Sequence, residues 1–260
     1  MSLVSEQSEV LIHDEEVMGT VVSFELYFSG ISRDRARSAV AAACDQLHVV
    51  DGVFSTWKPE SPMSRLRRGE VGIGEVPPQI SEVLEICSWA VEVSSGWFDP
   101  WALPGGVDPT GLVKGWAIEQ ITHLLIEAGI DAGMVNAGGD LATFGRPPKS
   151  DAWRIGIQHP WKADVLACVI ETSDSVATSG SYERGSHLFD PRTGRLVNEP
   201  GSATVVGASL TVADCLATAL AVSGEAGFEQ ISEVEGYGLY LILPDGREMS
   251  TSDIVFVNEI

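Results

Sequence analysis

Hydrophobic and polar positions alternate along this chain with two different periods. Residues 17–28 alternate as in a half-buried strand. Beyond about residue 150, short apolar runs predict further strands, with the sequences WRIGIQ, VLACVIET, ATVVGAS, GLYLIL and DIVFV. Apolar residues three or four positions apart predict helices over residues 35–54, 82–93, 112–128 and 212–222. Because helices and strands do not alternate strictly, the pattern favours an α+β fold over a doubly wound parallel sheet.

Polar and small residues mark where these elements should end. Ser81 is a candidate N-cap for the second helix, and Gly129 and Gly224 follow the third and fourth helices, which they are expected to stop. The polar segment before the first strand predicts an N-terminal tail over residues 1–16. No linker rich in Pro, Gly or Ser divides the remainder, so residues 17–260 are predicted to form a single domain.

The charge balance restricts the partners that this chain can have. Lys and Arg total 16 and Asp and Glu total 37, which gives a formal net charge of −21. A surface of that sign would repel a phosphate backbone, so we expect no nucleic acid partner. No apolar run is long enough to cross a bilayer, so no membrane insertion is expected. The first residues show neither a basic nor an apolar signal region, so a cytoplasmic location is predicted.

The cysteines and histidines show no metal-binding pattern along the sequence. Zinc and redox motifs place two thiols a few residues apart, and none of the four cysteines has such a neighbour. Each cysteine lies in an apolar stretch, as expected of a buried, reduced thiol. The five histidines show no ligand spacing either.

One candidate site for an anion lies where the third helix begins. Thr110 and Gly111 stand at its predicted start, where free backbone N–H groups and the helix dipole can face an anion. Lys114 follows one turn later as a point cation suited to phosphate. The same residues are also compatible with an ordinary helix start and a solvated lysine.

A second candidate site lies on the fourth helix. Asp214 and Thr218 are four residues apart, so they share one helix face and offer a carboxylate and a hydroxyl together, ligands that suit Mg²⁺. The alternative is that Thr211 and Asp214 form a capping box. His187 is compatible with a structural imidazole or with a general base.

Several polar segments, in order along the chain, resemble the motifs of the ApbE family, the FAD:protein FMN transferases. These are FSTWKPESPMSRL, GWFDP, VDPTGLVKGWA, VNAGGDL, ATSGSYER with SHLFDPRTGR, and TVADCLATAL; VMGT resembles the opening motif of the family. The resemblance extends from about residue 17 to residue 258. It implies an ApbE-like α+β fold with duplicated T-fold-like units in one chain.

The resemblance also implies an activity. Members of the family bind FAD and Mg²⁺, split the pyrophosphate and release AMP. They attach FMN to a Thr or Ser hydroxyl of an acceptor protein, in a segment of the type Asp-x-x-Ser/Thr-Gly-Ala-Thr. Two alternatives stay open at this stage, namely Mg²⁺-dependent hydrolysis of FAD to FMN and AMP, and flavin binding or trafficking without turnover.

Residue roles follow from the same motifs. The resemblance implies that the residues contacting FAD are Met18, Trp57, Trp97, Phe98, Asp99, Asp108, Lys114 and Phe189. It implies that Mg²⁺ is held by the Gly111 carbonyl, Asp214, the main chain of Ala217, and Thr218, which makes Asp214 a catalytic residue. His187 is implied as the base that removes the proton of the acceptor hydroxyl. The alternative for three of these residues is that they are aromatic side chains of the core, with no flat heterocycle against them; these are Trp57, Trp97 and Phe98.

Three departures from the family pattern are visible. Only residues 102–106 separate the GWFDP and VDPTG motifs, where longer members carry an extra segment. Arg67 stands where the family usually has Asn. Thr110 and Gly111 stand where the family has two glycines, which keeps the glycine whose carbonyl is implied as a ligand.

Overall fold

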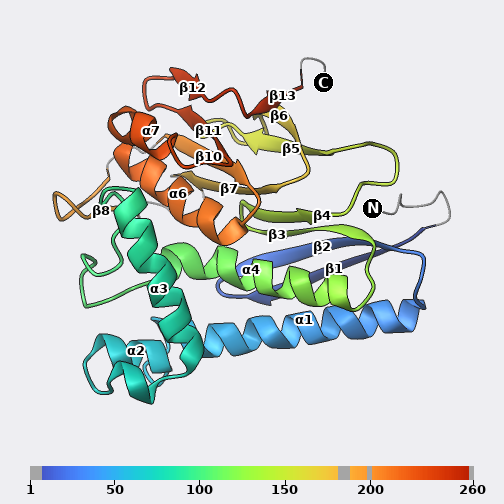
Figure 1. The fold of residues 1–260 in the computed structure, drawn as a ribbon, viewed down its shortest axis with the longest axis horizontal. Coiled ribbons are helices and arrows are strands. Elements are labelled where there is room, and N and C mark those ends of the chain that lie inside the picture. Colours follow the sequence, from blue (N-terminus) through green and yellow to red (C-terminus); the bar gives the residue numbers. More distant parts are fainter. Residues whose placement is uncertain (1–7, 181–187, 198–200, 258–260) are drawn as a thin grey trace.

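The computed structural model describes residues 8–180, 188–197 and 201–257, in which a layer of helices covers one large antiparallel sheet (Figure 1). The sheet order is β1-β2-β3-β4-β7-β10-β11-β12, and every neighbouring pair is antiparallel. The bounds of these strands are β1 Glu9–Val17, β2 Thr20–Phe28, β3 Ala132–Ala137, β4 Asp140–Phe144, β7 Ser175–Gly180, β10 Ser202–Gly207, β11 Tyr237–Ile242 and β12 Glu248–Ser250.

The helices pack on one face of this sheet, and α4 and α6 lie side by side at its centre (Figure 1). Alternate residues of β2 point into this layer and are fully buried, because the period of a strand is two. No helix among the described residues is long and apolar enough to cross a membrane. The helices are α1 Arg33–Phe54, α2 Pro62–Arg67, α3 Pro78–Val93, α4 Thr110–Glu127, α6 Leu210–Ser223 and α7 Glu225–Ile231, with a 3₁₀ turn, η1, at Ile73–Glu75.

A smaller sheet covers part of the opposite face. It has the order β13-β6-β5, with bounds β13 Val255–Phe256, β6 Leu166–Thr172 and β5 Trp153–Gln158. Trp153, Ile155 and Ile170 from this sheet form a second apolar core with residues of the large sheet such as Tyr240 and Ile242. Strands β7 and β10 are therefore covered on both faces, and every residue in them is buried. A two-stranded ribbon is formed by β8 Phe189–Asp190 and β9 Arg195–Leu196.

The structure confirms the α+β class and the helices expected from the apolar spacing. In α1, the apolar face predicted from Val40 to Phe54 is the buried face. Helix α4 ends before Gly129, and α6 ends at Gly224; both glycines have positive φ, as a helix-stopping residue requires.

Several boundaries and elements differ from the sequence-based predictions. The N-terminal tail expected over residues 1–16 is wrong for residues 9–16, which form most of β1; the charged residues of this edge strand hide its alternation. Helix α3 begins one turn before the expected cap Ser81, because Pro78 starts it with a preset φ and no N–H to satisfy. The short helices α2 and α7 were not expected, nor was β7, whose two buried faces leave no alternation to detect.

Helices α4 and α6 cross closely because a glycine lies at their contact. A Cβ on Gly115 would lie 2.7 Å from the Leu210 carbonyl oxygen and 2.8 Å from the Cβ of Asp214. The backbone of α4 can therefore approach α6 only where a side chain is missing. At the start of α6, Glu119 of α4 accepts hydrogen bonds from the Ser209 hydroxyl and the Thr211 N–H, both at 2.9 Å.

The N-terminus of α6 is capped differently from the capping box considered above. The Ser209 hydroxyl accepts a hydrogen bond from the Val212 N–H at 3.3 Å, so Ser209 is the N-cap. The Thr211 hydroxyl donates to Glu119, not to the turn that follows it. The carboxylate of Asp214 is therefore not needed for capping and faces α4.

We expect Gly115→Ala to destabilise the protein by about 2 kcal/mol, because the added methyl group would overpack the crossing of α4 and α6. Gly52→Ala is the matched control, since a Cβ on Gly52 within α1 would meet nothing within 4 Å. The control should be neutral or stabilising by up to about 1 kcal/mol, from helix propensity alone. Denaturant unfolding measures both variants, and equal effects would show that the crossing tolerates a side chain.

Candidate functional site

A pocket opens where the first turn of α4 and the middle of α6 meet the loop after α3. Most residues that the resemblance implies for FAD and Mg²⁺ line this pocket together. They are Trp97, Phe98, Asp99, Asp108, Gly111, Lys114, Phe189, Asp214 and Thr218. These residues come from elements far apart in the chain, and the helix crossing and β8 bring them to one place.

Three charged side chains form the polar floor beside this pocket. The Lys114 ammonium lies 2.8 Å from Asp140 Oδ2 and donates a hydrogen bond to the Gly138 carbonyl oxygen at 3.3 Å. Asp214 Oδ2 accepts a hydrogen bond from the Gly115 N–H at 2.9 Å. Asp140 is 1% exposed and Asp214 is 4% exposed. Buried charges of this kind persist only when they are paired or when they hold a cation.

Burial raises the pKa of the Asp214 carboxyl well above its usual range, and the neighbouring Asp140 carboxyl raises it further. Lys114 and the Gly115 N–H oppose this shift. The Asp214 carboxyl therefore lies close to both the Asp140 carboxyl and the Lys114 ammonium. The available donors are carboxylate and hydroxyl oxygens, which are the ligands that Mg²⁺ prefers.

Gly111 faces the hydroxyl of Thr218 across the helix crossing. A Cβ on Gly111 would lie 3.8 Å from Thr218 Oγ1 and 3.2 Å from the Phe98 ring. The Thr218 hydroxyl lies 3.3 Å from the hydroxyl of Ser179 on β7. The structure thus brings together Gly111, Asp214 and Thr218, whose proximity the sequence could only suggest. Ala217, which precedes Thr218 in α6, is fully buried.

Aromatic side chains form one wall of the pocket, and an arginine fixes one of them. The guanidinium of Arg192 lies 3.6 Å from the centroid of the Trp97 ring. Its Nη2 also donates a hydrogen bond to the Ser95 carbonyl oxygen at 2.6 Å, while Asp190 Oδ1 accepts from the Arg192 N–H at 2.9 Å. The turn after β8 therefore holds the loop after α3, which gives Arg192 a positioning role that the sequence did not reveal.

Four implied residues stand apart from this group. The Trp57 side chain is 92% exposed and does not line the pocket. Met18 occupies the turn between β1 and β2 with a φ of 54° and is not among the residues that line the pocket. Ala217 offers no side chain to the pocket, and His187 lies outside the described residues.

Arg67 holds the shortened segment between the GWFDP and VDPTG motifs. Its Nη1 lies 3.1 Å from Asp108 Oδ2, and its Nη2 donates a hydrogen bond to the Pro104 carbonyl oxygen at 2.8 Å. Asp108 Oδ1 in turn accepts from the N–H and hydroxyl of Thr110, at 3.1 and 2.7 Å. Arg67 and Asp108 therefore connect this segment to the start of α4.

Comparison with known proteins identifies the family of this chain. The sequence model of the ApbE family matches residues 18–105 and 102–241. The chain therefore belongs to the ApbE family. The FAD:protein FMN transferase of Klebsiella pneumoniae is 30% identical over 156 residues, which are 56% of this chain and 45% of that protein. That of Vibrio cholerae is 34% identical over 149 residues, which are 53% of this chain and 44% of that protein. The matches thus span less than half the length of these curated relatives.

Solved structures share the fold. The flavin transferase ApbE from Vibrio cholerae superposes with a TM-score of 0.83 at 23% identity, covering 94% of this chain and 98% of that one. The ApbE protein from Thermotoga maritima gives a TM-score of 0.82 at 20% identity, covering 94% and 97% of the two chains. The ApbE-like α+β fold expected from the motifs is confirmed.

Arg67→Ala should destabilise the protein by about 2 kcal/mol, because it leaves Asp108 without its cation in a largely buried place. It should also expose residues 102–106 to limited proteolysis, since the hydrogen bond to Pro104 is lost. Arg65→Ala on the same helix is the control, because its pair with Glu70 is exposed and spans 3.9 Å. Equal stability and equal proteolysis of the two variants would refute this anchoring role.

Proposed function

We propose that this protein is an FAD:protein FMN transferase. It binds FAD in the pocket between α4, α6 and β8, and it transfers FMN to a Thr or Ser hydroxyl of an acceptor protein, with release of AMP. One observation carries the proposal, namely that the motif residues of an ApbE family member converge on one pocket with Asp214, Thr218 and Lys114 at its base. The names of the relatives support the same reaction.

The donor set at the base of the pocket fits Mg²⁺. Asp214, Thr218 and the Gly111 carbonyl would hold it, together with the main chain of Ala217, and they offer only oxygen. The Asp140 carboxyl beside Asp214 adds negative charge that favours a bound cation. When bound, Mg²⁺ supplies charge stabilisation to pyrophosphate oxygens.

The protein's own groups bind and orient the substrate. Gly111 at the start of α4 and the Lys114 ammonium line the pocket, where they favour an anionic phosphate. Asp140 holds the ammonium in place at 2.8 Å. Phe98, Phe189 and the Trp97 ring fixed by Arg192 offer flat surfaces for a flavin or adenine ring.

The proposed roles in binding and activating the acceptor protein are taken from the family motifs. His187 is proposed as the base that takes the proton of the acceptor hydroxyl. The acceptor itself is proposed to carry a segment of the type Asp-x-x-Ser/Thr-Gly-Ala-Thr. Its hydroxyl attacks the phosphorus of the FMN half of FAD, and AMP leaves.

FAD should bind at least about tenfold more tightly with Mg²⁺ than with EDTA, a difference of about 1.4 kcal/mol. The quenching of flavin fluorescence in a titration of the purified protein measures this. Asp214→Asn keeps the size of the side chain but removes its charge, so this variant should bind FAD equally with and without Mg²⁺. Equal affinities in the unaltered protein would remove the metal from the proposal.

AMP release should require an acceptor peptide and should fall at least about 100-fold in Asp214→Ala, as for the loss of a group that stabilises developing charge. Asp245→Ala is the matched control, because Asp245 lies on an exposed turn where it pairs with Arg247. Chromatographic detection of AMP follows the reaction. AMP without acceptor would instead mean a hydrolase, and no AMP under either condition would mean a flavin-binding protein.

A further inference from the structure

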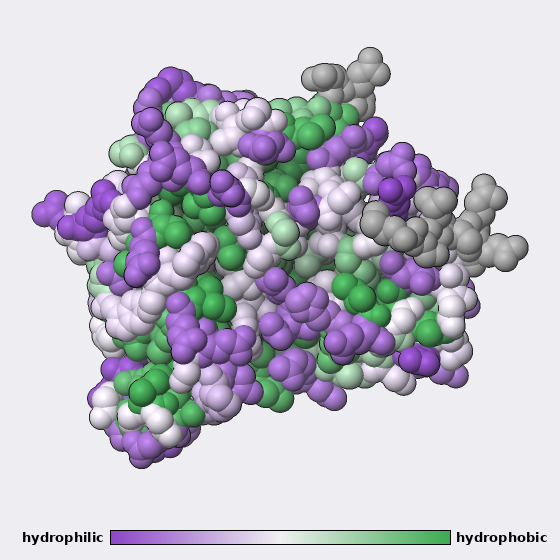
Figure 2. Space-filling model, viewed as in Figure 1, coloured by the Kyte–Doolittle hydropathy of each residue, from purple (hydrophilic) through white to green (hydrophobic). Residues whose placement is uncertain are grey.

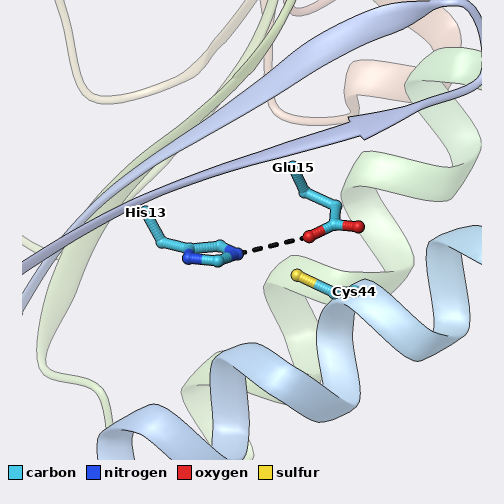
Figure 3. A group of neighbouring side chains, drawn as sticks. All are labelled: His13, Glu15 and Cys44. Carbon is cyan, nitrogen blue, oxygen red and sulfur yellow. Dashed lines mark ion pairs between the residues drawn. The ribbon is translucent and has the colours of Figure 1, made fainter.

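A second cluster of ligand-type side chains lies between β1 and α1, away from the pocket just described. Figure 3 shows His13 and Glu15 of β1 pointing toward Cys44 of α1. His13 and Glu15 are two residues apart, so they project from one face of the strand. Cys44 and His48 are four residues apart, so they share one face of the helix. The packing of β1 against α1 brings the pair on the strand close to the pair on the helix.

The distances within the cluster are short. One ligand atom from each of His13, Glu15 and Cys44 lies within 4.8 Å of the others. His13 Nε2 lies 3.4 Å from Glu15 Oε2, and His48 Nε2 lies 2.7 Å from Glu15 Oε1. Ligands around a tetrahedral ion with bonds of about 2.0 to 2.3 Å stand roughly 3 to 4 Å apart. The spacing of His13, Glu15 and Cys44 is therefore close to that of ligands around one ion, and His48 reaches the same Glu15 carboxylate.

We propose that His13, Glu15, Cys44 and His48 form a site for a divalent transition metal of the zinc class. Two imidazoles, one thiolate and one carboxylate are the donor types that Zn²⁺ takes in a four-coordinate site. The thiolate and the carboxylate balance the two positive charges of the ion. Hard ions such as Mg²⁺ are disfavoured by the sulfur and nitrogen donors, so this site differs in kind from the base of the pocket.

The surroundings suit a bound ion. Cys44 is 7% exposed, while the two histidines face an open groove that gives the ion an entry path. The groove also carries Arg33 and Arg37; Arg33 pairs with Glu9 at 2.9 Å. Burial raises the pKa of the Cys44 thiol to about 11, so binding of the ion would release the thiol proton.

Without metal, the same residues would be two histidines beside the Glu15 carboxylate, which also hydrogen-bonds to the Cys44 thiol. The two readings differ in what Cys44 does. Only a metal site requires the Cys44 sulfur to bond to the ion together with the imidazole of His48. A probe that reports on sulfur coordination therefore separates them.

Titration of the metal-free full chain with Co²⁺ provides that probe. We expect one tightly bound Co²⁺ with a thiolate-to-cobalt charge-transfer band and the visible bands of a tetrahedral ion. Cys44→Ser should abolish the charge-transfer band, and His48→Gln should weaken Co²⁺ binding at least about tenfold. Cys168→Ser and His123→Gln change a cysteine and a histidine outside the cluster, and both should leave the spectrum unchanged.

A further variant separates this site from the proposed magnesium site. Asp214→Asn should keep the charge-transfer band, because Asp214 is not part of the cluster. No charge-transfer band in the unaltered protein would overturn the proposal, as would a band that persists in Cys44→Ser. If Cys44→Ser does not fold, the Co²⁺ affinity of His48→Gln tests the proposal instead, because the exposed His48 side chain can be replaced without opening the core. Unchanged Co²⁺ affinity in that variant would overturn the proposal.

Discussion

The site depends on the close crossing of α4 and α6. Gly115 leaves room for Asp214 to reach the backbone of α4, and its N–H donates the hydrogen bond that holds this carboxyl in place. Gly111, one turn earlier, lies beside Thr218, where an added Cβ would stand 3.8 Å from the Thr218 hydroxyl oxygen. A side chain at Gly115 would force α4 away from Asp214 and the start of α6. The two halves of the large sheet, which meet at β4 and β7, are joined on their helical face by this same crossing (Figure 1).

Charge is distributed unevenly in this molecule. The sequence carries a net charge of −21, and Figure 2 shows hydrophilic residues over much of one face. Near the pocket, which Asp99, Asp108 and Asp214 line, the cations Arg67, Lys114 and Arg192 are each held by a carboxylate or a carbonyl oxygen. A cation fixed in this way keeps its position without a ligand, so less reorganisation is needed when an anion binds.

The sequence predicted well those helices whose apolar residues recur three or four positions apart. In α1 the opposite face is exposed, whereas no residue of α6 is exposed. The middle strands β7 and β10 are buried on both faces, so their alternation disappears and only the apolar run of β10 was readable. At the other extreme, β1 is an edge strand, and the acidic residues that blunt an edge also concealed it.

The two candidate sites show what spacing along a chain can and cannot reveal. Asp214 and Thr218 lie on one helix face, so their partnership was readable from a four-residue interval. The pairing of Lys114 with Asp140 was not, because it joins a helix to a β-hairpin. The absence of ligand spacing among the cysteines and histidines likewise excluded only local motifs. His13 and Glu15 on a strand, with Cys44 and His48 on a helix, are each regular pairs, and only the packing of β1 on α1 makes them one cluster. Metal-ligand pairs should therefore be sought within single elements and then matched across elements that pack together.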